Sequence, residues 1–141
     1  MCQYCKNPAL LKEIVKDTVS CSHWKRPHKQ CGICVPCLIR RAALFKAGIE
    51  EPNDIYLNSD IRKAYETLEE KTGKKDDITS VKTFIKQTYT DPACIEKKLA
   101  LSGITNQADT KRLVLLISRA AEELNCFLRH SFCTTMEGKG H

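Results

Sequence analysis

A chain of 141 residues, 42% of them hydrophobic, is long enough to bury one core, so its folding does not require disulfide cross-links. Its formal net charge of +6 is compatible with an anionic partner such as a nucleotide, a phosphate or RNA. No apolar run approaches the ~20 residues that cross a bilayer, and the N-terminus lacks the basic start and apolar core of a signal peptide. These features predict a cytoplasmic protein without a membrane anchor.

The first third of the chain predicts two short helices separated by a cysteine-rich loop. Asn7 suits an N-cap and Pro8 suits a first helical position, and the apolar residues that follow predict a helix ending before Asp17. The second helix is expected to open at Pro36 and to stop at Gly48, which suits a left-handed C-terminal cap. The sequence of residues 50–54 then predicts a segment boundary.

Beyond this boundary the hydrophobic periodicity is helical throughout. It predicts four helices between residues 57 and 130, with no strand of five or more residues. The last helix carries a stripe typical of a core or of a helix-partner surface: Leu113, Leu116, Ile117, Ala120, Leu124, Phe127 and Leu128. We therefore expect a mainly α fold with an N-terminal segment over residues 1–49, a helical extension over residues 50–133 and a disordered tail over residues 134–141.

Nine cysteines are many for a chain of this length, and most of them lie in its first quarter. The clustered six are Cys2, Cys5, Cys21, Cys31, Cys34 and Cys37. Because no secretory signal precedes them, we interpret them as metal ligands rather than as a disulfide framework. The other three, Cys94, Cys126 and Cys133, lack the histidine or aspartate setting of a nucleophile, so we assign no catalytic residue.

The spacing C-x9-C-x2-C-x2-C predicts a zinc site made of four thiolates. Cys31 and Cys34 form a metal knuckle in which Gly32 permits the required backbone turn. Cys37 lies at a helix start, where free amide groups favour a thiolate, and Cys21 completes the set. A site with four protein ligands leaves no open position for water, so this zinc is expected to be structural.

Other ligand sets fit the same region. Cys2 and Cys5 form a second C-x-x-C that could pair with the Cys31 knuckle, and His23 or His28 could replace a cysteine. An iron–sulfur cluster also takes four thiolates. We rank zinc on the four internal cysteines first.

Basic residues on either side of the knuckle suggest contact with anions. Arg40 lies one turn after Cys37 and, with its neighbour Arg41, could contact a phosphate or a carboxylate, although solvated arginines on a surface helix are equally common. A basic loop with one aromatic ring is compatible with RNA or DNA binding: Trp24, Lys25, Arg26, His28 and Lys29. Such a loop is more often simply solvated.

The runs "TVSCS" and "CGICVPCLIRRAALFKAGI" resemble the C-terminal end of 7-cyano-7-deazaguanine synthase-like proteins, a family that uses ATP. Within this family, the two runs are most similar in sequence to the synthase-like member of the bacterial Qat anti-phage defence system. "CKNPALL" resembles the segment before the cysteine loop, and the resemblance spans residues 1–48. It implies a zinc ion on the same four internal cysteines, and Arg40 matches the arginine three positions after the last ligand.

The resemblance also implies a missing half. The family acts as an ATP-dependent ligase on a carboxylated deazaguanine, and its Ser-Gly-Gly-x-Asp-Ser loop wraps ATP before the cysteines. This chain has no adjacent glycines and hence no such loop. We therefore expect a C-terminal piece of a larger α/β ATP-pyrophosphatase-type protein, which binds ATP only through an N-terminal nucleotide-binding half or subunit and has possible defence-system partners.

Overall fold

The structure, a computed structural model, describes residues 5–23, 29–72 and 77–133. Within these ranges the chain is helical and forms no strand, which confirms the predicted mainly α class. The elements are α1 (Pro8–Ile14), the 3-10 helix η2 (Val15–Asp17), α2 (Val35–Lys46), the 3-10 helix η3 (Asn53–Ile55), α3 (Ile61–Thr72), α4 (Asp77–Thr90), α5 (Ala93–Leu101) and α6 (Gln107–Cys133). No helix in the described ranges combines the length and apolarity needed to cross a membrane.

Both predicted N-terminal helices form, with local caps that explain their ends. The side chain of Asn7 accepts a hydrogen bond from the backbone N–H of Leu10 at 3.1 Å, and Pro8 is the first residue of α1. Helix α2 begins at Val35, one residue earlier than predicted. It ends before Gly48, whose φ of 64° lies in the left-handed region.

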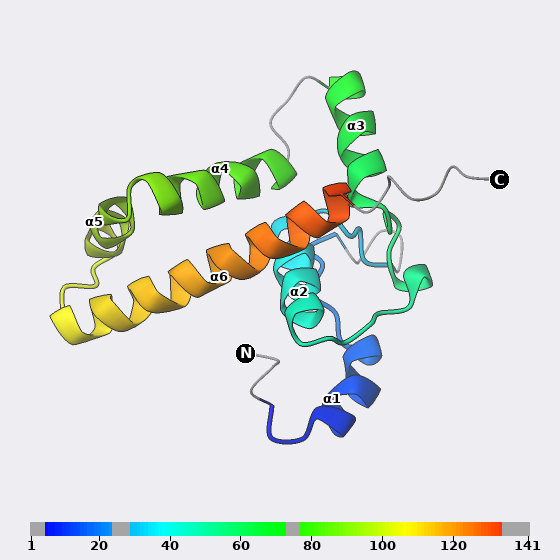
Figure 1. The fold of residues 1–141 in the computed structure, drawn as a ribbon, viewed down its shortest axis with the longest axis horizontal. Helices are drawn as coiled ribbons and strands as arrows, with labels where there is room; N and C mark the ends of the chain where they lie inside the picture. The colour runs from blue at the N-terminus through cyan, green and yellow to red at the C-terminus, as the bar shows by residue number, and fades with distance from the viewer. Residues whose placement is uncertain (1–4, 24–28, 73–76, 134–141) are drawn as a thin grey trace.

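The long helix α6 organises the core. It packs against α2, α3, α4 and α5, with α4 and α5 along one side and α2 near its C-terminal half (Figure 1). The main buried cluster consists of residues from α2, α3, α4 and α6: Leu38, Ala42, Ile61, Ile78, Val81, Ile85, Leu124, Phe127 and Leu128. The predicted stripe on α6 is thus buried at its C-terminal end, whereas Leu116 is 51% exposed and lies outside this buried cluster.

One buried cluster contains residues from both sides of the predicted boundary at residues 50–54. Leu38 and Ala42 of α2 share it with Ile61 of α3 and Leu128 of α6. The division at residue 49 stays a prediction, and the predicted disordered tail, residues 134–141, lies outside the described residues. Because α2 carries both core residues and cysteines, the helical core and the cysteine loop are mechanically linked.

Candidate metal centre

The structure brings together the four cysteines predicted from spacing. The Sγ atoms of Cys21, Cys31, Cys34 and Cys37 all lie within 4.8 Å of one another. The Cys31–Cys37 and Cys21–Cys34 sulfur pairs are each 4.0 Å apart. A tetrahedral zinc with Zn–S bonds of about 2.3 Å requires sulfur separations of about 3.8 Å. The four thiols, none of them in a disulfide, could therefore hold one metal ion.

Local backbone geometry aims these sulfurs at a common point. Cys34 is the N-cap residue of α2 and Cys37 lies in its first turn, so both sulfurs lie near the positive end of the helix dipole. Backbone N–H groups of Cys31 and His23 donate to the sulfur of Cys21 at 3.2 and 3.3 Å, and the N–H of Cys34 donates to that of Cys31 at 3.3 Å. Such donors stabilise thiolates, which are the metal-binding form.

Burial works against ionisation of these thiols. Cys37 is fully buried, and desolvation raises the pKa of its thiol well above the ordinary range. Desolvation likewise raises the pKa of Cys31. At Cys34 desolvation acts in the same direction, but hydrogen bonds from the backbone at Cys37 and Ser22 outweigh it and lower the pKa to about 6. A divalent cation among the sulfurs would supply the positive charge that buried thiolates need.

A glutamine that the sequence did not single out closes the cysteine loop. Gln30 is only 1% exposed, and its side-chain oxygen accepts from the backbone N–H and the hydroxyl of Ser20 at 3.2 and 3.0 Å. Its backbone N–H donates to Ile55 and its carbonyl accepts from Leu57, which forms an isolated parallel bridge with Tyr56. The segment after η3, residues 56–59, therefore holds in place the loop that carries the cysteines, and we call this segment the strap.

The alternative ligands fall outside the four-thiol group where the structure describes them. Cys5 is exposed and its sulfur hydrogen-bonds the carbonyl of Asn7 at 3.4 Å. The Nδ1 atom of His23 lies 3.4 Å from the hydroxyl of Ser22. Cys2 and His28, with Trp24 and the rest of the basic loop up to residue 28, lie outside the described residues. Their predicted contributions to metal or nucleic-acid binding stay predictions.

Arg40 is held by partners within the chain. Its Nε donates to the carboxylate of Glu51 at 2.8 Å, and its two Nη atoms donate to the carbonyls of Thr18 and Val15. The side chains of Arg40 and Glu51 are 9% and 8% exposed. Burial alone would lower the pKa of Arg40, but the Glu51 carboxylate outweighs burial and raises this pKa. The ion pair ties α2 to the segment that follows it, and the bonds to Thr18 and Val15 tie α2 to the segment that precedes the cysteine loop. Binding of an external phosphate stays a prediction.

Arg41 is held by hydrogen bonds to more backbone carbonyls than Arg40. Its guanidinium donates to the carbonyl oxygens of Gly32, Asn58 and Ser59 at 3.2, 3.1 and 2.6 Å. It also lies over the ring of Tyr56, 4.6 Å from the ring centroid. Burial lowers the pKa of Arg41 below its ordinary value. These contacts fasten the metal knuckle to the strap, which gives Arg41 a structural role besides its predicted anion contact.

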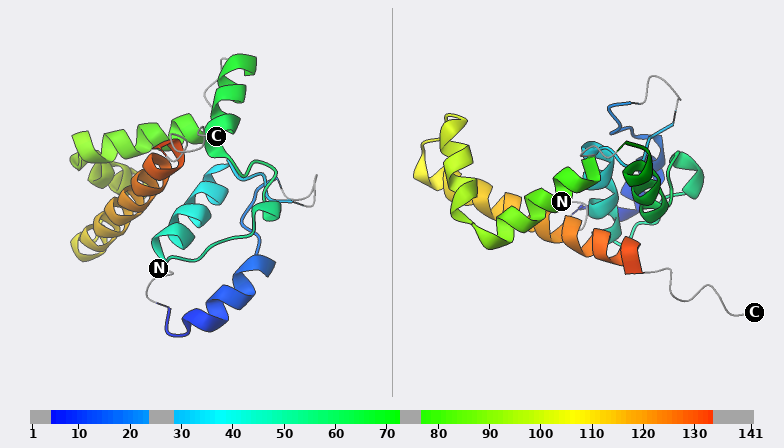
Figure 2. Two further views of the ribbon diagram at one scale, coloured as in Figure 1. Left: turned by 45° about the vertical axis from the view of Figure 1, so that its right-hand side comes forward. Right: turned by 90° about the horizontal axis from the view of Figure 1, so that it is seen from above.

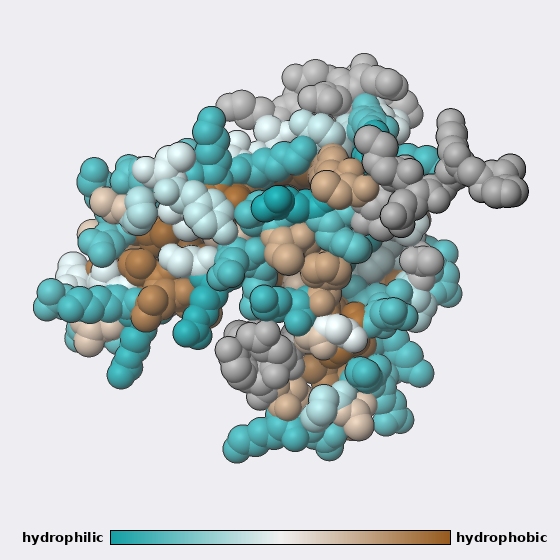
Figure 3. Space-filling model, in the orientation of Figure 1, coloured by the Kyte–Doolittle hydropathy of each residue, from teal (hydrophilic) through white to brown (hydrophobic). Residues whose placement is uncertain are grey.

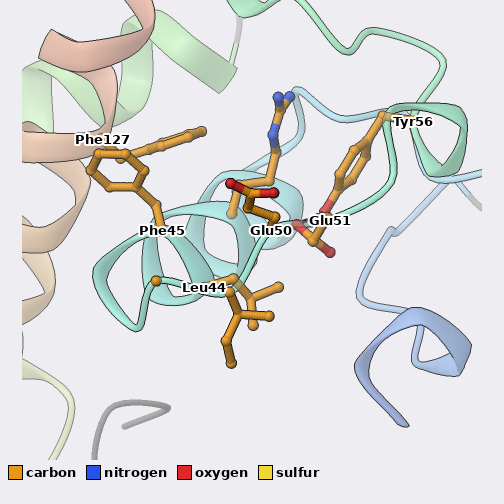
Figure 4. A pocket seen from close by; sticks show the side chains of 9 residues that line it. Leu44, Phe45, Glu50, Glu51, Tyr56 and Phe127 are labelled. Atoms are coloured by element: carbon orange, nitrogen blue, oxygen red, sulfur yellow. Dashed lines mark hydrogen bonds between the residues drawn. The ribbon is translucent and has the colours of Figure 1, made fainter. Parts of the chain in front are cut away.

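A pocket of about 520 Å³ lies beside Arg41 (Figure 4). It lies between the end of α2, the strap and α6, and its lining is Arg41, Leu44, Phe45, Gly48, Ile49, Glu50, Glu51, Tyr56 and Phe127. The rings of Phe45 and Phe127 are 5.7 Å apart, and the hydroxyl of Tyr56 donates to Glu51 at 2.7 Å. The charges of Arg41 and Glu51 are thus engaged internally, which indicates that they stabilise the pocket wall.

Gly32 gives a direct test of how tightly the knuckle fits the strap. Its φ is +84°, and a Cβ added there would lie 2.5 Å from the carbonyl oxygen of Asn58. Gly103 has nearly the same φ, +85°, but an added Cβ would meet nothing within 4 Å. We expect Gly103→Ala to cost about 1–2 kcal/mol from the left-handed backbone alone, and Gly32→Ala to cost about 1–3 kcal/mol more from the clash.

Urea unfolding of the metal-loaded variants measures this difference. Equal losses of unfolding free energy for the two alanine variants would contradict the close contact between Gly32 and Asn58.

Comparisons with known proteins leave the family open. The chain matches no protein-family profile, no curated protein sequence and no solved structure. The likeness to deazaguanine synthase-like proteins therefore stays a prediction that rests on the cysteine knuckle and the residues around it. What the geometry gives independently is a group of four thiols able to hold a metal ion.

Proposed function

We propose that this chain is a zinc-stabilised structural module, with one Zn²⁺ bound by Cys21, Cys31, Cys34 and Cys37. The observation that carries the proposal is the approach of all four sulfurs to within 4.8 Å of one another. Four thiolates saturate a tetrahedral zinc, so the ion has no position for a water or a substrate. Its function is then to stabilise the fold around it. Elemental analysis of the purified chain, with one zinc per chain expected, tests the proposal.

The zinc would fasten three parts of the molecule at one point. Cys21 follows η2, the Cys31 knuckle contacts the strap, and Cys37 belongs to α2. The strap also contacts the knuckle without the help of the metal, because the side chain of Asn58 donates a hydrogen bond to the carbonyl of Cys31 at 2.7 Å. Metal binding therefore supports the orientation of α2, on which the helical core is built.

The sequence resemblance supports a finer proposal. On this proposal residues 1–49 are the zinc-binding C-terminal segment of a 7-cyano-7-deazaguanine synthase-like protein, similar to the one in Qat anti-phage defence. The whole enzyme would be an ATP-dependent ligase that acts on a carboxydeazaguanine, with ATP bound by an N-terminal half or subunit. The support is the "CGICVPCLIRRAA" run, whose three cysteines and Arg40, together with Cys21 upstream, match the positions that the resemblance implies.

This finer proposal makes a prediction about the isolated chain. It should neither hydrolyse ATP nor turn over a deazaguanine acid, because no glycine-rich loop holds the phosphates and a saturated zinc activates no water. Release of pyrophosphate, measured with and without an added nucleotide-binding half or subunit, checks this. Turnover that survives purification of the bare chain would overturn the finer proposal, whereas the zinc content would still decide the structural one.

A further inference from the structure

The N-terminal half of α6 presents an outward side that combines leucines with cations. Lys111, Arg112, Leu115, Leu116 and Arg119 are all exposed there, and we call them the α6 outer face. Positions three and four apart on a helix are neighbours, so these residues form one stripe about 12 Å long. Leu115 and Leu116 are 60% and 51% exposed, which is costly for large apolar side chains.

The opposite side of this half-helix is already occupied. Ile117 lines a small, mainly apolar cavity of about 130 Å³ together with Phe84 of α4 and Ile95 of α5. Figure 2 shows that this end of α6, with α4 and α5 beside it, projects away from α1, α2 and α3. In Figure 3 a brown area bordered by hydrophilic side chains marks the same end of the molecule. The outer face therefore receives no cover from the described part of the chain.

The cations of the outer face are unpaired within the described ranges. The ion pairs found there join Arg40 to Glu51 and Arg62 to Glu66, and none involves Lys111, Arg112 or Arg119. The nearest carboxylates along α6 belong to Asp109 before the stripe and to Glu122 and Glu123 after it, and they mark where the basic stripe begins and ends. A surface with unpaired positive charges around exposed leucines is complementary to a partner surface whose apolar residues are bordered by carboxylates.

We propose that the α6 outer face docks an acidic amphipathic helix of a partner protein. Leucine-type side chains of that helix would cover Leu115 and Leu116, and its glutamates or aspartates would pair with the three cations. A nucleic-acid backbone offers phosphates but no apolar group for the leucines. A lipid surface requires a broad apolar face, and the apolar side of α6 is buried against α4 and α5.

A synthetic helical peptide tests this surface on the full, zinc-loaded chain. The peptide carries leucines at helical spacing flanked by glutamates, and a scrambled peptide of the same composition is the comparison. Fluorescence anisotropy should show binding of the helical peptide that weakens as salt rises. The double change Leu115→Ser and Leu116→Ser should weaken it at least about tenfold, because two apolar contacts are lost. Lys111→Glu with Arg112→Glu should weaken it by a similar factor.

A matched control separates this face from general charge attraction. Lys86→Glu with Lys97→Glu reverses two exposed cations on α4 and α5 and should leave peptide binding unchanged. Helical content and zinc content should equal those of the parent chain in every variant, because each substituted side chain is exposed. Equal binding of the scrambled peptide, or full binding by the leucine variant, overturns the proposal. So does binding of RNA or anionic vesicles, but not of the peptide, through the same residues.

Discussion

Replacing Cys34 with serine is expected to abolish zinc binding and to unfold the cysteine loop together with the start of α2. Cys34 is buried and is the N-cap residue of α2, and its sulfur lies 4.0 Å from the sulfur of Cys21. Structural zinc in small domains contributes on the order of 10–16 kcal/mol of apparent binding free energy at neutral pH. This is as large as the whole unfolding free energy of a typical domain, about 5–15 kcal/mol. Zinc-to-protein ratios and thermal unfolding, with and without a chelator, measure the effect.

Cys126→Ser is the matched control for this experiment. Cys126 lies on α6, is exposed and is outside the four-thiol group, so its replacement should leave the zinc ratio and the melting temperature unchanged. Iron in place of zinc in the parent chain would contradict the proposal. So would a result in which Cys2→Ser abolishes metal binding while Cys21→Ser does not.

The features that could be predicted from sequence are those set by near neighbours along the chain. The Asn7 cap and the Gly48 stop need only one helix turn of context, and both are present. The approach of Cys31 to Cys34 follows from a turn of four residues. Cys21 is further away, but the shared chemistry of four thiols in one short segment was enough to include it. Periodicity similarly gave a mainly helical chain without strands in the described ranges.

The features that could not be predicted depend on contacts between distant segments. Nothing near Gln30 in the sequence indicates that it is buried under the strap, and nothing near Glu51 indicates that it meets Arg40. The residue pattern predicted a guanidinium of Arg40 that is available to an external anion. In the structure, tertiary contacts supply it with carboxylate and carbonyl partners. Leu116 shows the limit of periodicity, because it is 51% exposed although the next residue, Ile117, lines a cavity with Phe84 of α4 and Ile95 of α5.

Arg40→Ala is expected to lower the unfolding free energy by about 3–5 kcal/mol, the range seen when one partner of a buried ion pair is removed. The change leaves the Glu51 carboxylate, 8% exposed, with the hydroxyl of Tyr56 as its remaining hydrogen-bond partner among the described residues. It also removes donors from the carbonyls of Thr18 and Val15. Urea unfolding of the zinc-loaded variant measures the loss, and zinc content should stay unchanged because Arg40 is no ligand.

Two further variants decide whether the loss comes from the buried pair. In a Glu51→Gln background, Arg40→Ala should cost less than in the parent chain, since no unpaired carboxylate remains. Arg62→Ala removes a solvent-exposed pair with Glu66, whose side chains are 39% and 55% exposed, and should cost at most about 1 kcal/mol. If Arg40→Ala costs no more than Arg62→Ala, the guanidinium is not needed inside the fold. It would then be available for the phosphate or carboxylate contact that the sequence predicts.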